Sequence, residues 1–335
     1  MFKFLRKNQK KLENAHKSDS YSYDNGFMIC HNCSETIPFS DLIPLSLSKC
    51  PKCNKDIFIP KKMDKYWLLE QLGDGGMGYV FKAIDTGTGK RCAIKILHDK
   101  KTEKEQFGNP LRQEAQIGLE ISTHANICTI IEYGQLENEY YMVTEFLDGC
   151  RLDKLVASGG VIDEEKALLW VLQILSALQH VYNCGYLYRD LKPQNLIVRP
   201  DGEDIVLFDF GLCLELEKIE RNDGDSVEGS PQYFPPERCD FEKEGMYSEI
   251  YSLGMVLYYC LAGKPYYCAD TVEELLQQHV RRLRMKSVFE KLENCNPDIV
   301  ALIDKMIKRE PTERFQTYNE VYIELDQIYK LYLSC

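Results

Sequence analysis

Two short segments in the middle of the chain carry the residue types and spacing of a phosphoryl-transfer site. Residues 188–195 read Tyr-Arg-Asp-Leu-Lys-Pro-Gln-Asn, and residues 209–211 read Asp-Phe-Gly. In such a site an aspartate (here Asp190) accepts the proton of a substrate hydroxyl, and an asparagine five residues later (Asn195) holds magnesium. The second aspartate, Asp209, would hold the metal that bridges the ATP phosphates. Either segment alone is a common accident, but the two in this order are a strong signal.

A glycine-rich segment upstream fits a phosphate-binding loop. Residues 73–80 read Gly-Asp-Gly-Gly-Met-Gly-Tyr-Val, which matches the pattern G-x-G-x-x-G-x-V. Glycine is needed there because the backbone lies close over phosphates, where a Cβ would block the approach. Dinucleotide sites share part of the pattern, but they place a helix after the loop. Residues 79–83 have the pattern of a strand, so we expect the loop to be the tip of a hairpin.

One lysine lies inside the apolar strand that follows. Residues 93–97 read Ala-Ile-Lys-Ile-Leu, and a buried lysine is costly unless it is paired. Glu114, in the helical run 111–121, is the expected partner of Lys95. The other expected partners are the α- and β-phosphates of ATP.

The order of these segments resembles that of the eukaryotic-type (Hanks-type) serine/threonine protein kinases, especially their bacterial branch. The resemblance spans residues 64–331. Within it, residues 124–127 (His-Ala-Asn-Ile) resemble the turn after the regulatory helix. Residues 143–147 (Val-Thr-Glu-Phe-Leu) resemble the hinge that binds adenine through its backbone, with Thr144 at the gatekeeper position.

The resemblance implies an α+β fold with two lobes. We expect a small lobe, 64–146, built from an antiparallel sheet with one key helix, and a mainly helical large lobe, 147–331. ATP and magnesium would lie in the cleft between the lobes. Lys192, two residues after Asp190, marks serine/threonine specificity in this family and would stabilise the moving phosphoryl group.

The residues expected around ATP come from the glycine-rich loop, the strand lysine with its partner, and the hinge. They are Leu72, Gly73, Asp74, Gly75, Gly76, Met77, Gly78, Tyr79, Val80, Ala93, Lys95, Glu114, Thr144, Glu145 and Leu147. The expected catalytic residues are Asp190, Lys192, Asn195 and Asp209, of which Asn195 and Asp209 hold magnesium.

Residues 229–237 (Gly-Ser-Pro-Gln-Tyr-Phe-Pro-Pro-Glu) resemble the end of an activation segment. In the family the final glutamate, here Glu237, pairs with a late arginine, here Arg314. Ser230 replaces the more common threonine but keeps the hydroxyl. Pro235 replaces an alanine.

The resemblance also implies a switch. The arginine before the catalytic aspartate, Arg189, binds a phosphorylated activation segment in similar kinases. Ser226, four residues before Ser230, is the expected phosphorylation site. The alternative is that a nearby carboxylate already supplies the negative charge, with three candidates: Asp223, Asp225 and Glu228.

Two further departures from the family pattern concern the catalytic loop. Tyr188 replaces the usual histidine, and its ring can fill the same packing role. Glu249 replaces an aspartate that ties the loop backbone to a buried helix; its extra methylene is expected to shift that anchor by about an ångström and slow catalysis. The alternative function is a zinc-ribbon docking protein with a weakly active or inactive kinase scaffold.

Four of the fourteen cysteines have the spacing C-x2-C-x16-C-x2-C, which is typical of a zinc site: Cys30, Cys33, Cys50 and Cys53. Four thiolates bind zinc tetrahedrally and leave no open position, so the metal would be structural. Iron–sulfur or disulfide chemistry and chance spacing are the alternatives.

We expect these cysteines to organise a zinc-ribbon-like module over residues 27–58, joined to the kinase by a linker, 59–63. Six apolar residues would form its small core: Ile37, Phe39, Leu42, Ile43, Leu45 and Leu47. About thirty residues cannot fold on such a core alone, so the metal would supply most of the stability.

Composition adds few constraints. The 335 residues carry a net charge of −11, which argues against general nucleic-acid binding. Residues 1–26 are basic, then polar, and we expect a disordered tail, although contact with an acidic partner or a membrane surface is an alternative. No apolar run reaches membrane-spanning length, and ten scattered further cysteines suit a reducing cytoplasm. The expected partners are protein substrates and an unknown partner of the zinc module.

Overall fold

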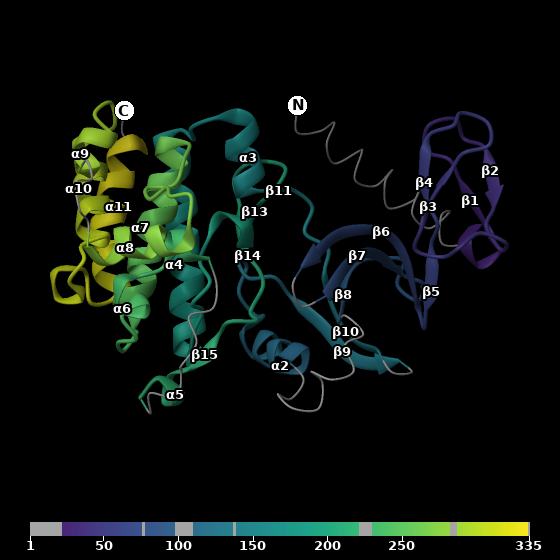
Figure 1. The fold of residues 1–335 in the computed structure, drawn as a ribbon, viewed down its shortest axis with the longest axis horizontal. Helices are drawn as coiled ribbons and strands as arrows, with labels where there is room; N and C mark the ends of the chain where they lie inside the picture. Colours follow the sequence, from purple (N-terminus) through teal and green to yellow (C-terminus); the bar gives the residue numbers. More distant parts are fainter. Residues whose placement is uncertain are drawn as a thin grey trace. The chain divides into compact units, whose positions relative to one another are not determined.

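The computed structural model describes residues 22–75, 78–97, 110–136, 139–220, 230–281 and 287–333. The chain divides into two compact units. One comprises Met1–Ala115 and Thr129–Leu147, and the other comprises Gln116–Cys128 and Asp148–Cys335. Figure 1 shows strands dominating the first unit and helices dominating the second, which confirms the expected α+β class.

Among the described residues, a sheet of six antiparallel strands forms the body of the first unit (Figure 1). The strands, in spatial order, are β5 (Lys61–Met63), β6 (Tyr66–Gly75), β7 (Gly78–Asp85), β8 (Arg91–Leu97), β10 (Glu139–Glu145) and β9 (Ile130–Leu136). In β8, Cys92, Ile94 and Ile96 are buried on one face. Lys95 lies on the other face because side chains alternate along a strand.

The sheet buries one continuous apolar cluster. Its fully buried members include Leu68 on β6, Ala83 on β7, Ile94 on β8 and Val143 on β10. Because each strand contributes to the same face, this cluster fixes the strand register and thereby the position of every residue at the strand ends. The one key helix expected in the small lobe corresponds to α2 (Pro110–Ile121).

The N-terminal module consists of two short hairpins. The first pairs β1 (Phe27–Ile29) with β2 (Thr36–Pro38), and the second pairs β3 (Leu47–Lys49) with β4 (Asp56–Phe58). Of the six residues expected in its core, Ile37 is buried, and Phe39 and Leu42 pack against the same cluster. Leu45 instead packs against the cluster of the six-stranded sheet.

The two remaining residues of that expected core lie on the surface. Ile43 is 76% exposed, and Leu47, on β3, is 71% exposed. Leu47 lies on the solvent face of its hairpin, because a two-stranded hairpin has one face to bury, whereas Ile43 lies in the loop before β3. The space that they were expected to fill is taken by Tyr23, Ile59 and Trp67, which are buried in the module cluster.

Both boundaries of the module differ from the expected ones. Residues 61–63, the end of the expected linker, form β5 and pair with β6, with Met63 opposite Tyr66. Residues 22–24, in the expected tail, form a helical turn whose Tyr23 is buried. Apolar contacts explain both differences, because Met63 and Tyr23 each join a buried cluster. Residues 1–21 lie outside the described part of the chain.

The second unit is built around α7 (Met246–Ala262), in which every residue from Ser248 to Leu261 is buried. A Cβ at Gly254 would lie 2.7 Å from the Ile307 side chain and 2.8 Å from that of Met306, so glycine permits close packing there. The other helices in this unit are α3 (Leu152–Gly159), α4 (Glu164–Asn183), α5 (Leu216–Glu220), α6 (Pro236–Cys239), α8 (Val272–Arg281), α9 (Val288–Lys291), α10 (Pro297–Met306) and α11 (Tyr318–Leu333).

Short strands in the second unit precede and follow the two segments that are expected to carry catalysis, residues 188–195 and 209–211. A three-stranded sheet is made of β11 (Cys150–Arg151), β13 (Leu196–Val198) and β14 (Ile205–Leu207), and β12 (Tyr186–Leu187) pairs with β15 (Leu214–Glu215). Within the described ranges, no helix combines the length and the apolar character needed to cross a bilayer.

Candidate active site

Asp190 lies in the loop between β12 and β13 and is held by two side chains of the same loop. Lys192 Nζ donates to Asp190 Oδ2 over 2.7 Å, and Asn195 Nδ2 donates to the same oxygen over 2.8 Å. Asn195 Nδ2 also donates to the Asp190 carbonyl over 3.0 Å. The structure therefore brings together three of the four residues expected to carry catalysis, with one carboxylate at the centre.

The surroundings of Asp190 favour its protonated form more than water does. Burial raises the pKa of its carboxyl above the ordinary 3.8, and the charge of Asp209 adds to this. Lys192 and Asn195 act in the opposite direction without cancelling the burial. A carboxylate with a raised pKa is a stronger proton acceptor than an exposed one.

Asn195 and Asp209 lie at the same end of the β13–β14 hairpin. Leu196 pairs with Leu207, so the residues flanking this pair are also neighbours. The Phe208 amide donates to the Asn195 carbonyl over 3.1 Å. Asp209 has a φ of +69°, an uncommon conformation for a residue with a side chain. The hairpin therefore places together the two residues expected to hold magnesium.

Tyr188 links the two catalytic segments. Its hydroxyl donates to the Phe208 carbonyl over 2.6 Å, and its ring stands at 74° to that of Phe210. The side chain is fully buried, so this hydrogen bond satisfies a hydroxyl that would otherwise be costly to bury. The ring fills the packing position expected for it and also holds the backbone just before Asp209.

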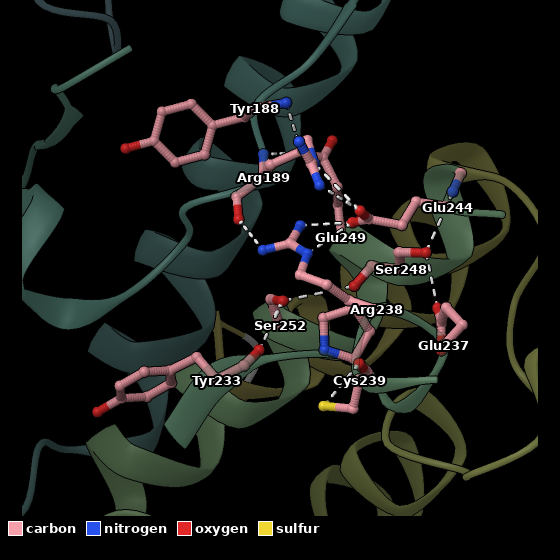
Figure 2. Close-up of polar contacts among 12 residues, drawn as sticks. Tyr188, Arg189, Tyr233, Glu237, Arg238, Cys239, Glu244, Ser248, Glu249 and Ser252 are labelled. Carbon is pink, nitrogen blue, oxygen red and sulfur yellow. Dashed lines mark hydrogen bonds and ion pairs between the residues drawn. The ribbon is translucent and has the colours of Figure 1, made fainter. Parts of the chain in front are cut away.

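Glu249 on α7 holds the backbone of the loop that contains Asp190 by two hydrogen bonds (Figure 2). Its Oε1 accepts hydrogen bonds from the amides of Tyr188 over 2.6 Å and Arg189 over 2.9 Å. The longer side chain thus makes both anchoring bonds at ordinary lengths. Its Oε2 accepts a short hydrogen bond from the hydroxyl of Tyr318, a buried residue at the start of α11. The sequence contained no signal for this third contact.

In the first unit, Lys95 and Glu114 form the expected ion pair. Lys95 Nζ lies 2.7 Å from Glu114 Oε2, with the glutamate side chain 2% exposed. β8 lies between β7 and β10, where Lys95 is opposite Val80 and Met142. A central strand position and a buried partner fix the ammonium group firmly.

The glycine-rich loop is a hairpin tip, as its pattern predicted. Asp74 pairs with Tyr79 and Gly75 with Gly78 where β6 turns into β7. A Cβ at Gly78 would lie 2.1 Å from the Ile96 carbonyl oxygen, so no other residue fits this close approach of β7 to β8. Gly76 and Met77 lie outside the described residues.

The other expected nucleotide contacts occupy the strand ends of the same unit. Leu72 and Gly73 belong to the end of β6, and Ala93 on β8 lies opposite Thr144 on β10. The Thr144 hydroxyl donates to the carbonyl of Glu145 over 3.0 Å. Leu147 follows two residues after the end of β10.

Glu237, at the end of the activation segment, pairs with Arg314 as the resemblance implied. Nη1 and Nη2 of Arg314 donate to the two carboxylate oxygens over 2.7 and 2.8 Å. Both side chains are at most 1% exposed. The Ser248 hydroxyl also donates to Glu237 over 2.6 Å (Figure 2). Ser230 is the first described residue of this region, and Ser226 lies outside the described residues.

Arg189 has a partner that the sequence did not reveal. Its Nε and Nη2 donate to Glu244 Oε1 over 3.0 and 2.7 Å. The two residues are 55 positions apart, in segments without regular periodicity, so no spacing rule points to the pair. Of the residues considered for this role in the sequence, Asp223, Asp225 and Glu228 are outside the described ranges.

The four cysteines of the N-terminal module converge on one point. Their sulfur atoms all lie within 4.8 Å of one another, with Cys30–Cys53 and Cys33–Cys50 separations of 3.6 Å. Four sulfurs about 2.3 Å from a central zinc would be about 3.8 Å apart. The geometry therefore fits one tetrahedral metal ion.

The two cysteine turns have the same backbone design. The amide of Cys30 donates to Glu35 and that of Ser34 to Cys30, both over 2.8 Å. Cys50 repeats this arrangement with Lys55 and Asn54 over 2.9 Å. Such repeated turns leave each pair of sulfurs facing the same centre.

Comparison with protein-family models matches residues 66–323 to the protein kinase domain. A probable serine/threonine-protein kinase of Clostridium acetobutylicum is 32% identical over 275 residues, which cover 81% of this chain and 41% of that protein. Serine/threonine-protein kinase PrkC of Bacillus subtilis is 27% identical over 78% of this chain and 40% of its own length. PknD of Mycobacterium tuberculosis is 29% identical over 77% of this chain and 39% of its own length. The chain spans about two fifths of the length of these relatives.

Proposed function

The chain belongs to the protein kinase family, and we propose that it transfers the γ-phosphoryl group of ATP to serine and threonine hydroxyls of proteins. The observation that carries the proposal is the Asp190 carboxylate, buried and held by Lys192 and Asn195. Phosphoryl transfer needs little covalent work from the protein, so a fixed proton acceptor and fixed charges account for most of the catalysis.

Each residue of this group has a separate role in the proposal. Asp190 orients the substrate hydroxyl and accepts its proton, for which its raised pKa suits it. Lys192 keeps the Asp190 carboxylate in place and stabilises negative charge on the phosphoryl group as it moves. Its presence two residues after Asp190 supports serine and threonine, rather than tyrosine, as the acceptors.

Asn195 and Asp209 would hold magnesium. Both offer oxygen ligands, which are the type that this hard cation prefers, and the hairpin keeps them adjacent. When bound, magnesium neutralises charge on the phosphates. The chain itself contributes the rigidity of the pair, through the Phe208–Asn195 backbone bond and the Tyr188 hydroxyl.

The first unit would bind the nucleotide. Lys95, fixed by Glu114, supplies a cation for the phosphates, and the backbone of the glycine-rich hairpin covers them. The ends of β8 and β10, with Ala93 and Thr144, and the following residues Glu145 and Leu147 would contact the adenine.

The test uses the purified chain with labelled ATP, magnesium and a generic protein acceptor. We expect label on serine or threonine, and a loss of transfer in the Asp190→Asn protein. Matched nucleotide binding by the two proteins, with transfer in neither, would support the docking-scaffold alternative. A product containing mainly phosphotyrosine would overturn the assignment of acceptor.

We also propose that the N-terminal cysteines hold one structural zinc ion. The support is the convergence of Cys30, Cys33, Cys50 and Cys53 and the soft character of their sulfur ligands. Metal analysis of protein purified under reducing conditions should find one zinc per chain. Iron, or the absence of any metal with intact thiols, would count against zinc.

Further proposals concern compartment, partners and regulation. Ten cysteines outside the metal cluster are scattered along the chain, which supports a reducing compartment such as the cytoplasm. We expect protein substrates and a partner of unknown identity for the zinc module. Phosphorylation of Ser226 and a regulatory role of Ser230 stay predictions.

A further inference from the structure

A buried arginine at the end of the activation segment reaches the catalytic loop. Arg238, on α6, is 5% exposed, and its Nη1 donates to the carbonyl oxygen of Arg189 over 2.6 Å. Its Nε and Nη2 donate to Glu244 Oε2 over 2.9 and 2.5 Å. Figure 2 shows this guanidinium between the Arg189 backbone and the Glu244 carboxylate.

Glu244 binds two arginines at once. Its Oε2 accepts from Arg238, and its Oε1 accepts from Nε and Nη2 of Arg189. Burial alone would raise the pKa of this carboxyl, but the charges and hydrogen bonds of the two arginines hold the pKa below the ordinary 4.5. Glu244 is therefore an anion at neutral pH and faces one buried cation, Arg238, and one half-buried cation, Arg189.

These contacts converge on the backbone of one residue, Arg189. Arg189 has a φ of +67°, a conformation that a long side chain rarely adopts and that needs support from its surroundings. Glu249 holds the amide of Arg189, and Arg238 holds its carbonyl. Because Arg189 directly precedes Asp190, the two contacts together set the direction in which the Asp190 side chain leaves the backbone.

We propose that Arg238 and Glu244 are positioning residues for phosphoryl transfer: they fix the Arg189 carbonyl and guanidinium and so orient Asp190 without a phosphate on the activation segment. The inference rests on the proposed function of Asp190. Glu244 fills the anionic role toward Arg189 that the resemblance assigned to phosphate. We therefore expect phosphorylation of Ser226 to raise kcat only slightly.

A purely structural role is the competing explanation, because the same pair also joins α6 to the segment before α7. The two roles differ in their kinetic effects. If the two residues position Asp190, their loss lowers kcat, while the nucleotide affinity and the thermal midpoint stay near the wild-type values. A structural role lowers all three together.

The experiment compares Arg238→Gln and Glu244→Gln with two controls that carry the same chemical changes at exposed positions. Arg309→Gln removes an arginine whose ion pair with Asp240 is 3.8 Å long, and Glu242→Gln removes an exposed carboxylate two residues from Glu244. For each protein, kcat, KM for ATP, KM for a peptide acceptor and the thermal midpoint are measured.

We expect kcat to fall by roughly tenfold to a hundredfold in both variants, the size of effect that small misplacements of catalytic groups produce. Both KM values should stay within about twofold, and the controls should match the wild type. Arg238→Lys keeps the charge but not the planar fork, so its kcat should be intermediate. Should Glu244→Gln fail to fold, Arg238→Lys and Arg238→Gln carry the test alone.

The Ser226→Ala variant tests whether Asp190 is oriented without a phosphate on the activation segment. This variant should keep at least half of the wild-type kcat. Unchanged kcat in the folded Arg238 variants, or a loss of kcat that parallels nucleotide affinity, would overturn the positioning role. A Ser226→Ala protein with less than a tenth of the wild-type kcat would show that Asp190 does need a phosphate on the activation segment for its orientation. A wild-type chain that binds ATP without transfer would instead count against the proposed function.

Discussion

Trp67 donates a hydrogen bond from its indole Nε1 to Asp24 Oδ1 over 3.0 Å and thereby ties the six-stranded sheet to the N-terminal module. Its ring lies 5.7 Å from that of Tyr23 and 5.9 Å from that of Phe39. Trp67 is on β6, the strand that runs on to the glycine-rich loop. The cysteine module is therefore packed against the six-stranded sheet.

Metal removal should be visible in the fluorescence of Trp67. The chain has two tryptophans, and a Trp170→Phe background leaves Trp67 alone. Without the metal the module loses most of its stability, so a chelator should expose the 6%-exposed indole and shift its emission to longer wavelength. Cys30→Ser should reproduce the shift.

The control for that experiment is Cys268→Ser, which removes an exposed cysteine of the second unit. Its emission should match that of the Trp170→Phe parent. An unchanged spectrum after the metal has been lost, as measured by atomic absorption, would show that the module does not depend on metal.

Asp209→Ala should lower phosphoryl transfer by about a hundredfold or more, because it removes a fixed charge that the transition state uses. The fold should survive, since the backbone bond between Phe208 and Asn195 does not involve the side chain. Initial rates at saturating magnesium, together with circular dichroism, give the measurement. Near wild-type transfer would refute the assignment of the metal site.

Lys192→Met should change the pH dependence of catalysis as well as its rate. Lys192 opposes the effect of burial on Asp190, so its loss should raise the pKa of that carboxyl further. The Asp190 carboxylate can then accept a proton only at higher pH. The acidic limb of the plot of kcat/KM against pH should therefore shift to higher pH. Lys166→Met, which breaks the exposed pair with Glu203, is the control. A rate loss with an unmoved limb would contradict the role of Lys192 toward Asp190.

Arg314→Lys should destabilise the chain by about 1–3 kcal/mol, because it keeps the charge opposite Glu237 but leaves buried carbonyl acceptors without a donor. Arg314 satisfies Glu237 with two bonds and also donates to the carbonyls of Tyr247 and Lys308, which an ammonium group cannot do together. Denaturant unfolding measures the change. Arg309→Lys, at an exposed position, should cost less than about 0.5 kcal/mol. A similar cost for both variants would show that the pair contributes little.

Short motifs allowed several contacts to be predicted across long distances in the chain. Lys95 with Glu114 and Glu237 with Arg314 were expected and are confirmed, although the second pair spans 77 positions. The convergence of the cysteines also followed from spacing alone. The lysine pair and the cysteine site follow from residue types at fixed spacings, whereas the Glu237–Arg314 pair was implied by the family resemblance.

The contacts of Arg238, Glu244 and Tyr318 were not predictable in this way. Arginine, glutamate and tyrosine are common residues, and nothing in their spacing marks them as partners of residues 49 to 69 positions away. The same holds for Trp67, because no motif indicates its contacts with Tyr23 and Asp24.

The proposed chemistry could be predicted from the sequence, because a proton acceptor, metal ligands, a paired lysine and clustered thiols are residue types at fixed spacings. What holds those groups in place became apparent only in the folded chain. Packing of helices and strands sets which distant side chains become buried neighbours, and buried polar groups must find partners there. For that reason the support beneath Asp190, from Glu249, Arg238 and Glu244, emerged only from the fold.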